Sequence, residues 1–98
     1  MDRKIAGYLG LCARARKIVI GETAMMHITS KKAKLVFLAS DSSDRTKKKV
    51  KNACNSHSVL CIDQFASHEI SATIGQENRM IVAIEDEGLA KQILNCLK

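Results

Sequence analysis

Four short apolar runs without polar alternation separate segments of helical periodicity, and this arrangement constrains the fold more than any other feature of the sequence. The runs are KIVIG (17–21), LVFLAS (35–40), VLCI (59–62) and MIVAI (80–84). An apolar run that lacks alternation is typical of a strand covered on both faces. Because strands that alternate with helices need crossover connections, helices should cover both faces of one sheet. The pattern predicts an α/β protein, a three-layer α/β/α sandwich.

Five helical segments fill the intervals between these runs. The first follows Asp2 as its N-cap, and the third follows a cluster of capping residues at 42–44. The second covers 22–32 and ends in lysines that suit a helix C-terminus. The fourth covers 65–74 with Gly75 as its C-cap. The fifth carries an apolar stripe of Leu89, Ala90, Ile93, Leu94 and Leu97.

The chain is expected to be one domain spanning 1–98. It contains no proline, and we find no low-complexity tract or linker. No segment approaches the ~20 apolar residues that span a bilayer, and charges interrupt the opening MDRKIAGYLGLCARARK. The four cysteines form no CxxC and are more typical of reduced thiols than of a disulfide framework. We therefore expect a cytoplasmic protein without a membrane partner. We also expect a monomer.

The charge of the chain is basic and uneven. Sixteen Lys and Arg residues against ten Asp and Glu give a formal net charge of +6. Residues 1–51 hold 13 of the basic residues and four acids, whereas residues 52–98 hold three and six. This excess favours a polyanionic partner such as nucleic acid, although a basic surface also aids solubility. The first half of the chain is the expected contact region.

The junction ARARKIVIGET, residues 13–23, is the first candidate anion site. Arg14, Arg16 and Lys17 lead into a strand. Gly21, Glu22 and Thr23 then open a helix, whose free backbone N–H groups can bind phosphate or base edges. The alternative is an ordinary turn glycine, because glycines often precede helices.

A run of lysines on the third helical segment is the second candidate. Lys47, Lys48 and Lys51 lie together on an exposed flank at helical spacing, and Lys32 and Lys34 add charge from the same half. Each phosphate contact would make affinity fall with salt. The alternative is a merely solvated face.

Metal binding and catalysis are poorly supported. Cys54, His57 and Cys61 give C-x2-H-x3-C, but both cysteines fall in apolar patterns and no fourth ligand is evident. The chain has no P-loop, GxSxG or GxGxxG. We therefore expect no metal, no cofactor and no enzymatic activity. The aromatic residues Tyr8, Phe37 and Phe65 also lie in apolar patterns, so no stacking platform for single strands is expected.

Several segments together resemble one protein family. They are LGLCARARKIVIGETAMMHITSKKAKLVFLASDSSDRTKKKV, IGQENRMIVAI and EDEGLAKQI, and the most specific likeness is the Gly21 helix opening and the AKLVFLASD strand. Over nearly the whole chain the sequence is similar to the ribosomal protein L7Ae/L30e family, most of all to its short bacterial YlxQ-type members. The resemblance implies an α/β/α fold with a central four-stranded mixed sheet. It also implies RNA binding, commonly at kink-turns, where the backbone bends sharply beside sheared G·A pairs.

The resemblance places the RNA surface at the opening of the second helix and at the loop before the last strand. Gly21 matches the family. Residues 22–24 are Glu-Thr-Ala where the archaeal type has Thr-Asn-Glu, and His27 stands where it has Lys. Residues 76–79, Gln-Glu-Asn-Arg, replace the usual apolar loop, in which Arg79 could clasp a phosphate.

These observations predict a non-catalytic RNA-binding protein that recognises a kink-turn or a similarly bent RNA and is associated with the ribosome or RNA processing. The expected contact residues, which should converge on one face, are Arg14, Arg16, Lys17, Gly21, Glu22, Thr23, His27, Lys32, Lys34, Lys47, Lys48 and Arg79. The alternative from a different class is a protein-interaction module of the translation machinery that docks an acidic partner. A small enzyme is a third option.

Overall fold

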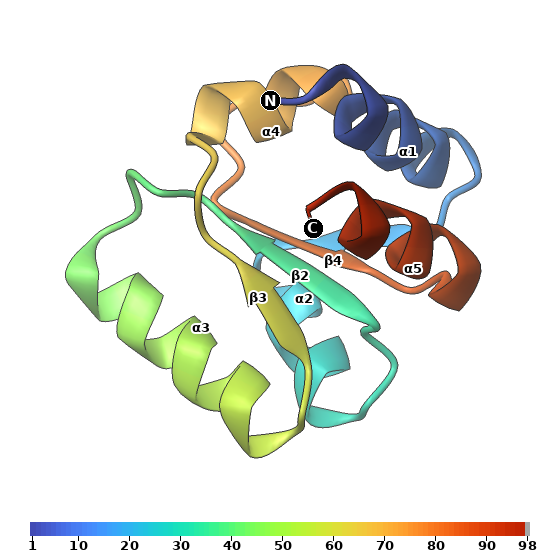
Figure 1. Ribbon diagram of the computed structural model, residues 1–98. Coiled ribbons are helices and arrows are strands. Elements are labelled where there is room, and N and C mark those ends of the chain that lie inside the picture. Colours follow the sequence, from blue (N-terminus) through green and yellow to red (C-terminus); the bar gives the residue numbers. More distant parts are fainter. Residues whose placement is uncertain (98) are drawn as a thin grey trace.

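Five helices alternate with four strands in the computed structural model, which describes residues 1–97 (Figure 1). The order is α1 (Arg3–Arg14), β1 (Ile18–Ile20), α2 (Gly21–Thr29), β2 (Leu35–Leu38), α3 (Asp44–Ser56), β3 (Leu60–Ile62), α4 (Ser67–Thr73), β4 (Ile81–Ile84) and α5 (Glu87–Cys96). This order confirms the alternation predicted from the apolar runs. None of the described helices has the length and apolar character needed to cross a membrane.

The strands form one mixed sheet in the order β1-β4-β2-β3. β4 lies antiparallel between β1 and β2, and β3 pairs parallel with β2 at the edge. β1, β2 and β3 therefore point in one direction and β4 in the other. Helices α1, α4 and α5 cover one face of the sheet, and α2 and α3 cover the opposite face (Figure 1). The three-layer α/β/α sandwich is confirmed.

β2 divides its side chains between two cores, one under each helical layer. Leu35 and Phe37 pack with α1, α4 and α5, whereas Val36 and Leu38 pack with α2 and α3. All four side chains are fully buried. Full burial of a Val, Leu or Phe side chain contributes about 1.5–3 kcal/mol to the free energy of unfolding. This strand is therefore a main source of stability. Its lack of polar alternation follows from this double coverage.

Two details of the sequence prediction are wrong. β3 was expected to be buried, but it lies at the sheet edge and Leu60 is 54 % exposed. The second helix was expected to reach residue 32, but it ends at Thr29. Lys31 and Lys32 consequently lie in the turn that follows α2.

Helices α1 to α4 all end in the same hydrogen-bonded turn, in which the residue after the C-cap adopts a left-handed backbone. These residues are Arg16, Lys31, Ser58 and Gly75, with φ of 58°, 61°, 56° and 72°. The next N–H in each case donates to the carbonyl five residues earlier, as Lys17 does to Cys12 at 2.9 Å. Glycine is the usual residue at this position because it carries no Cβ. Only α4 uses it.

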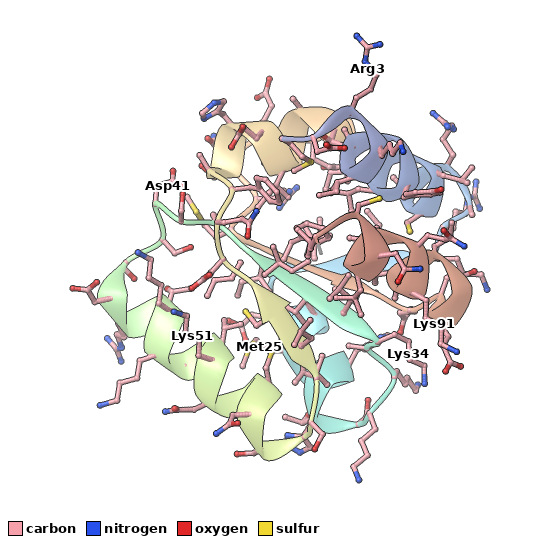
Figure 2. All side chains as sticks on the ribbon, viewed as in Figure 1. Arg3, Met25, Lys34, Asp41, Lys51 and Lys91 are labelled. Carbon is pink, nitrogen blue, oxygen red and sulfur yellow. The ribbon has the colours of Figure 1, made fainter. Side chains whose placement is uncertain are left out.

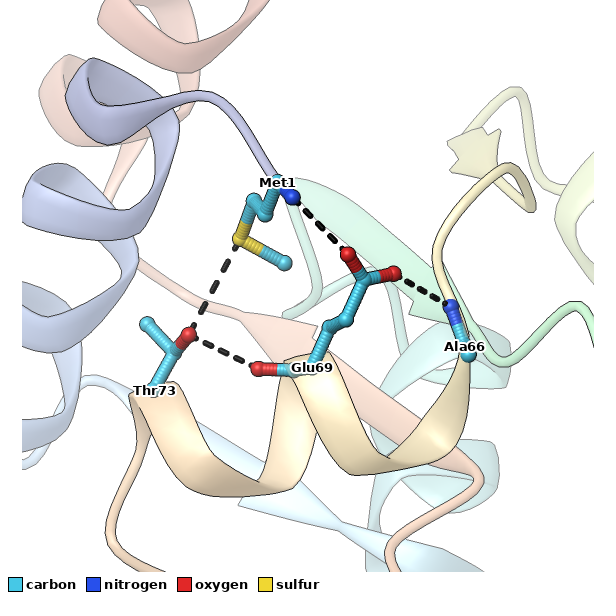
Figure 3. Close-up of polar contacts among 4 residues, drawn as sticks. All are labelled: Met1, Ala66, Glu69 and Thr73. Atoms are coloured by element: carbon cyan, nitrogen blue, oxygen red, sulfur yellow. Dashed lines mark hydrogen bonds and ion pairs between the residues drawn. The ribbon is translucent and has the colours of Figure 1, made fainter.

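The start of α4 is fastened from two sides. Both carboxylate oxygens of Asp41, in the loop after β2, accept hydrogen bonds from Ser67, one from the N–H and one from the hydroxyl, each at 2.7 Å. Glu69 accepts from the N–H of Ala66 at 3.0 Å and from the amino group of Met1 at 2.8 Å (Figure 3). The N-terminus and the loop after β2 are thereby both fastened to the start of α4.

Two substitutions in opposite directions, one to glycine and one from glycine, test the left-handed turns at the helix ends. Ser58→Gly is expected to raise the free energy of unfolding by up to about 1 kcal/mol, because a left-handed non-glycine residue costs about 1–2 kcal/mol and the entropy of glycine offsets part of the gain. Gly75→Ala should lower it by about 1 kcal/mol through strain alone, since an added Cβ meets no atom within 4 Å. Urea denaturation measures both, and a shift of both variants in the same direction would contradict the assignment.

Asp41→Asn tests the fastening of α4. The Ser67 hydroxyl and then its N–H hold the pKa of Asp41 below its usual range, so the carboxylate stabilises the fold above about pH 4 and loses this effect as the pH falls through its folded-state pKa. The variant should melt below the wild type at neutral pH, and the two melting temperatures should converge in acid. Thermal melts across the acidic range measure this, and curves that stay parallel throughout would refute it. Ser67→Ala should lower the free energy of unfolding by about 1 kcal/mol, less than Asp41→Asn does, because it removes the hydroxyl donor and keeps the Ser67 N–H.

Candidate nucleic-acid interface

The sheet topology places the predicted contact residues at two opposite ends of the sheet. β1 and β2 are parallel, so the residues before them share one end, and the residues after them share the other. Gly21, Glu22, Thr23, Lys47, Lys48 and Arg79 lie at the second of these ends, whereas Arg14, Arg16, Lys17, His27, Lys32 and Lys34 lie at the first. Figure 2 shows Lys34 and Asp41 at opposite sides of the molecule. The single face expected from the sequence is therefore two faces.

We call the face at the end that holds Gly21 the Gly21 face, made of Gly21, Glu22, Thr23, Lys47, Lys48, Lys49 and Arg79. Its centre is the start of α2, where Gly21 has a φ of +59° and an added Cβ would meet no atom within 4 Å. Ile20 at the N-cap provides no side-chain hydrogen bond, so the first N–H groups of α2 have no side-chain cap. Uncapped N–H groups at a helix N-terminus bind anions. The turn is open to a ligand from outside.

Lys49 of α3 reaches the opening of α2. Its Nζ lies 3.7 Å from Glu22 Oε1, and both side chains are mostly exposed. An exposed pair of this kind contributes little to stability, so a ligand can separate it at small cost. Sequence reasoning missed Lys49 because only Lys47, Lys48 and Lys51 share one helical flank. The lysine run itself was the available signal.

Lys51 does not belong to the Gly21 face, because it forms an ion pair with Asp63. Its Nζ lies 2.6 Å from Asp63 Oδ2, at the end of β3. The hydrogen bond between them raises the pKa of Lys51 and lowers the pKa of Asp63. The lysine flank predicted on α3 is thus divided between an ion pair with Asp63, which follows β3, and the Gly21 face.

Ser71 fixes the loop 76–79 beside the Gly21 face. This serine is buried in α4, and its Oγ accepts a hydrogen bond from the N–H of Arg79 at 2.8 Å. Its carbonyl accepts from the N–H of Gln76 at 2.8 Å. The Arg79 guanidinium donates to Gln76 Oε1 at 3.3 Å. Sequence reasoning missed Ser71 because a serine on a short helix carries no pattern that predicts burial.

Two of the positions that the resemblance compares with the archaeal type, residues 24 and 27, serve the fold instead. Ala24 is fully buried against the sheet. His27 lies at the opposite end of α2 from Gly21, and its Nδ1 contacts Glu85 Oε2. Neither side chain can take part in the Gly21 face.

Met26 provides an apolar surface that the sequence did not predict. It lies one turn after Thr23 on α2 and is 66 % exposed. On the same helix Ile28 is fully buried and Met25 is half-buried. The exposure of the adjacent Met26 follows from the same helical geometry.

The second face, which we call the Lys34 face, consists of Arg14, Arg16, Lys17, Lys31, Lys32 and Lys34. All six side chains are exposed. The carbonyl of Lys17 accepts from the N–H of Glu85 at 2.8 Å, and the N–H of Lys34 donates to the carbonyl of Ile84 at 2.7 Å. These bonds hold Lys17 and Lys34 on either side of the end of β4.

The cysteine and histidine spacing noted in the sequence forms no ligand cluster. Cys54 is a buried residue of α3, Cys61 is half-buried on β3, and His57 Nδ1 lies 2.9 Å from the carbonyl oxygen of Ala53. No group of three His, Cys, Asp or Glu residues within 1–97 is arranged to hold a metal ion.

Comparisons with known proteins identify a family and two similar proteins. A model of the ribosomal protein L7Ae/L30e/S12e/Gadd45 family matches residues 3–94. The chain is 40 % identical to the RNA-binding protein YlxQ of Enterococcus faecium over 91 residues, 92 % of this chain and 87 % of that protein. It is 39 % identical to the protein of the same name from Bacillus subtilis over 90 residues, 91 % of this chain and 90 % of that protein.

Solved structures share the fold. A protein of unknown function from Bacillus halodurans superposes with a TM-score of 0.91 at 27 % identity, with 96 % of each chain covered. The 15.5kD RNA binding protein of Giardia lamblia superposes with a TM-score of 0.78 at 16 % identity, covering 94 % of this chain and 80 % of that one, which shows a common fold. From the family match over residues 3–94 and these relatives, the chain belongs to the ribosomal protein L7Ae/L30e/S12e/Gadd45 family.

Proposed function

We propose that this protein is a non-catalytic RNA-binding domain that recognises a kink-turn or a similarly bent RNA through the Gly21 face. The observation that carries the proposal is the open start of α2, where uncapped N–H groups and a glycine with nothing over its Cβ position face solvent. Two relatives at about 40 % identity are named RNA-binding proteins, which supports the same assignment.

The chemistry of the Gly21 face suits an irregular RNA. Side chains cannot read the narrow major groove of a regular RNA helix, so proteins recognise bases that a bend or bulge exposes. The Glu22 carboxylate can accept hydrogen bonds from base amino groups, and the Thr23 hydroxyl can both donate and accept. Because Glu22, Thr23 and Ala24 replace the archaeal Thr-Asn-Glu, the bases read here differ from those of the archaeal type.

The cations around this opening would hold the RNA backbone. Lys47, Lys48 and Lys49 come from α3, and Arg79 comes from the loop that Ser71 fixes. Phosphate contacts position an RNA without reading its sequence, whereas contacts at the α2 opening would select the bend. We extend the proposal to a role at the ribosome or in RNA processing, in the cytoplasm and as a monomer.

A bent RNA should bind more tightly than a straight one. We expect a kink-turn RNA to bind at least about tenfold more tightly than a continuous duplex of the same composition, because only the bend presents bases to the α2 opening. The logarithm of affinity should fall with the logarithm of salt concentration with a slope of about −3 to −5, for three to six phosphate contacts. Fluorescence anisotropy in a salt series measures both. Equal affinity for the two RNAs would contradict recognition of a bend, and a flat salt response would contradict the phosphate contacts.

Gly21→Ala tests the open turn directly. The added methyl group meets no atom of the protein, but it occupies the space through which the RNA would approach the α2 N–H groups. We expect the affinity for kink-turn RNA to fall about tenfold or more, since a steric block and strain at a positive φ act together. Gly7→Ala is the matched control, because it also adds a methyl with no atom within 4 Å, on α1. If the control loses as much affinity as Gly21→Ala at equal folded fraction, the α2 opening is not the site.

A further inference from the structure

We infer that the Lys34 face is a second RNA-binding surface, which holds the phosphates of an RNA helix independently of the Gly21 face, so that one protein joins two RNA segments. The inference rests on the proposed function only in taking RNA as the ligand. It starts from the separation of the two faces: Lys17 precedes β1 and Gly21 follows it, which places them about 13 Å apart along the strand. They open at opposite ends of the sheet.

The cations of the Lys34 face have no ionic partners within residues 1–97. The acids at this end are already engaged: Glu85 contacts His27, Glu87 pairs with Lys91 at 3.8 Å, and Asp86 caps α5 by accepting from the N–H of Leu89 at 2.9 Å. No ion pair of the described residues includes any of the six Lys34-face cations. Their positive charge is therefore available to a ligand.

Two of these cations occupy positions that disfavour them. Arg16 and Lys31 have positive φ at the ends of α1 and α2, where glycine would be free of strain. A cation near a helix C-terminus does gain from the dipole, but α1 and α2 together present only about one negative charge to six cations. The fold alone does not account for so much charge at this end.

The composition of the face favours phosphate over an acidic protein. The segments 14–17 and 31–34 expose no large apolar side chain. Protein interfaces bury an apolar core inside a polar rim, and the Lys34 face provides no such core. Lys17 and Lys34 lie on either side of the end of β4, two strand spacings or roughly 10 Å apart. Their positive charges therefore form a row across this end of the sheet. A row of flexible cations fits the backbone of an RNA helix.

The test is a double variant that reverses charge on this face. Lys17→Glu with Lys34→Glu leaves the backbone hydrogen bonds of both residues in place, because they use the Lys17 carbonyl and the Lys34 N–H. The matched control is Arg3→Glu with Lys4→Glu, which makes the same charge change at the first turn of α1. Arg3 projects away from the body of the molecule, at a distance from Lys34 (Figure 2). Two RNAs serve as probes: a short kink-turn RNA and a continuous duplex of about 16 base pairs.

The wild-type protein, saturated with the kink-turn RNA, should still bind the duplex and form a complex of one protein with both RNAs in native mass spectrometry. The Lys17/Lys34 variant should bind the duplex about tenfold more weakly and the kink-turn RNA within about twofold of wild type, since two phosphate contacts are lost from one face only. The Arg3/Lys4 control should keep both affinities. Competition between the two RNAs, an equal loss in the control, or an unchanged duplex affinity in the Lys17/Lys34 variant would each overturn the inference.

Lys31→Gly separates a binding role from a structural one. It removes the strain at a positive φ, so thermal stability should be kept or raised while duplex affinity falls about twofold or more. A loss of stability with unchanged duplex affinity would show that the cation serves only the helix end. If the wild-type protein does not bind the kink-turn RNA but binds the duplex in a way that depends on Lys34, this inference is supported and only the Gly21 proposal is contradicted. Binding of an acidic peptide such as polyglutamate in place of either RNA would assign the face to a protein partner and overturn it.

Discussion

The antiparallel insertion of β4 between the parallel strands β1 and β2 is the constraint on which the rest of the structure depends. The register sets Ile84 opposite both Ile18 and Leu35, and the fully buried β2 holds this arrangement between two helical layers. Because β1 and β2 run the same way, every loop before them gathers at one end and every loop after them at the other. Both candidate faces follow from this one pairing.

The same pairing sorts the helix dipoles. α2 and α3 follow β1 and β2, so their N-termini point to the Gly21 face, and α1 and α2 end at the Lys34 face. The Gly21 face combines backbone N–H groups with a few cations, which suits contact with exposed bases as well as phosphates. The Lys34 face has more positive charge than its helix dipoles and acidic residues balance. This excess suits contact with RNA phosphates, which does not depend on the RNA sequence. The two ends therefore differ in chemistry.

The sequence predicted the fold well because unalternating apolar runs and helix caps are local signals. Asp2 and Gly75 act at helix ends as expected. The edge position of β3 was not predicted, because the apolar run VLCI is compatible with an edge strand as well as with a central strand. The candidate site was predicted less well, because periodicity does not reveal strand order. Without the position of β4, Lys34 and Gly21 could not be assigned to opposite ends, and the contacts of Lys49 with Glu22 and of Ser71 with Arg79 depend on tertiary packing.

The most direct test of the account is a map of backbone amide shifts, recorded by two-dimensional ¹H–¹⁵N NMR while kink-turn RNA is added. If RNA enters the α2 opening, the largest shifts will fall on the N–H groups of Gly21, Glu22 and Thr23, with a second group in the loop 76–79. Shifts that centre on α5 or β3, and leave the N–H groups of α2 at their free positions, would contradict the account.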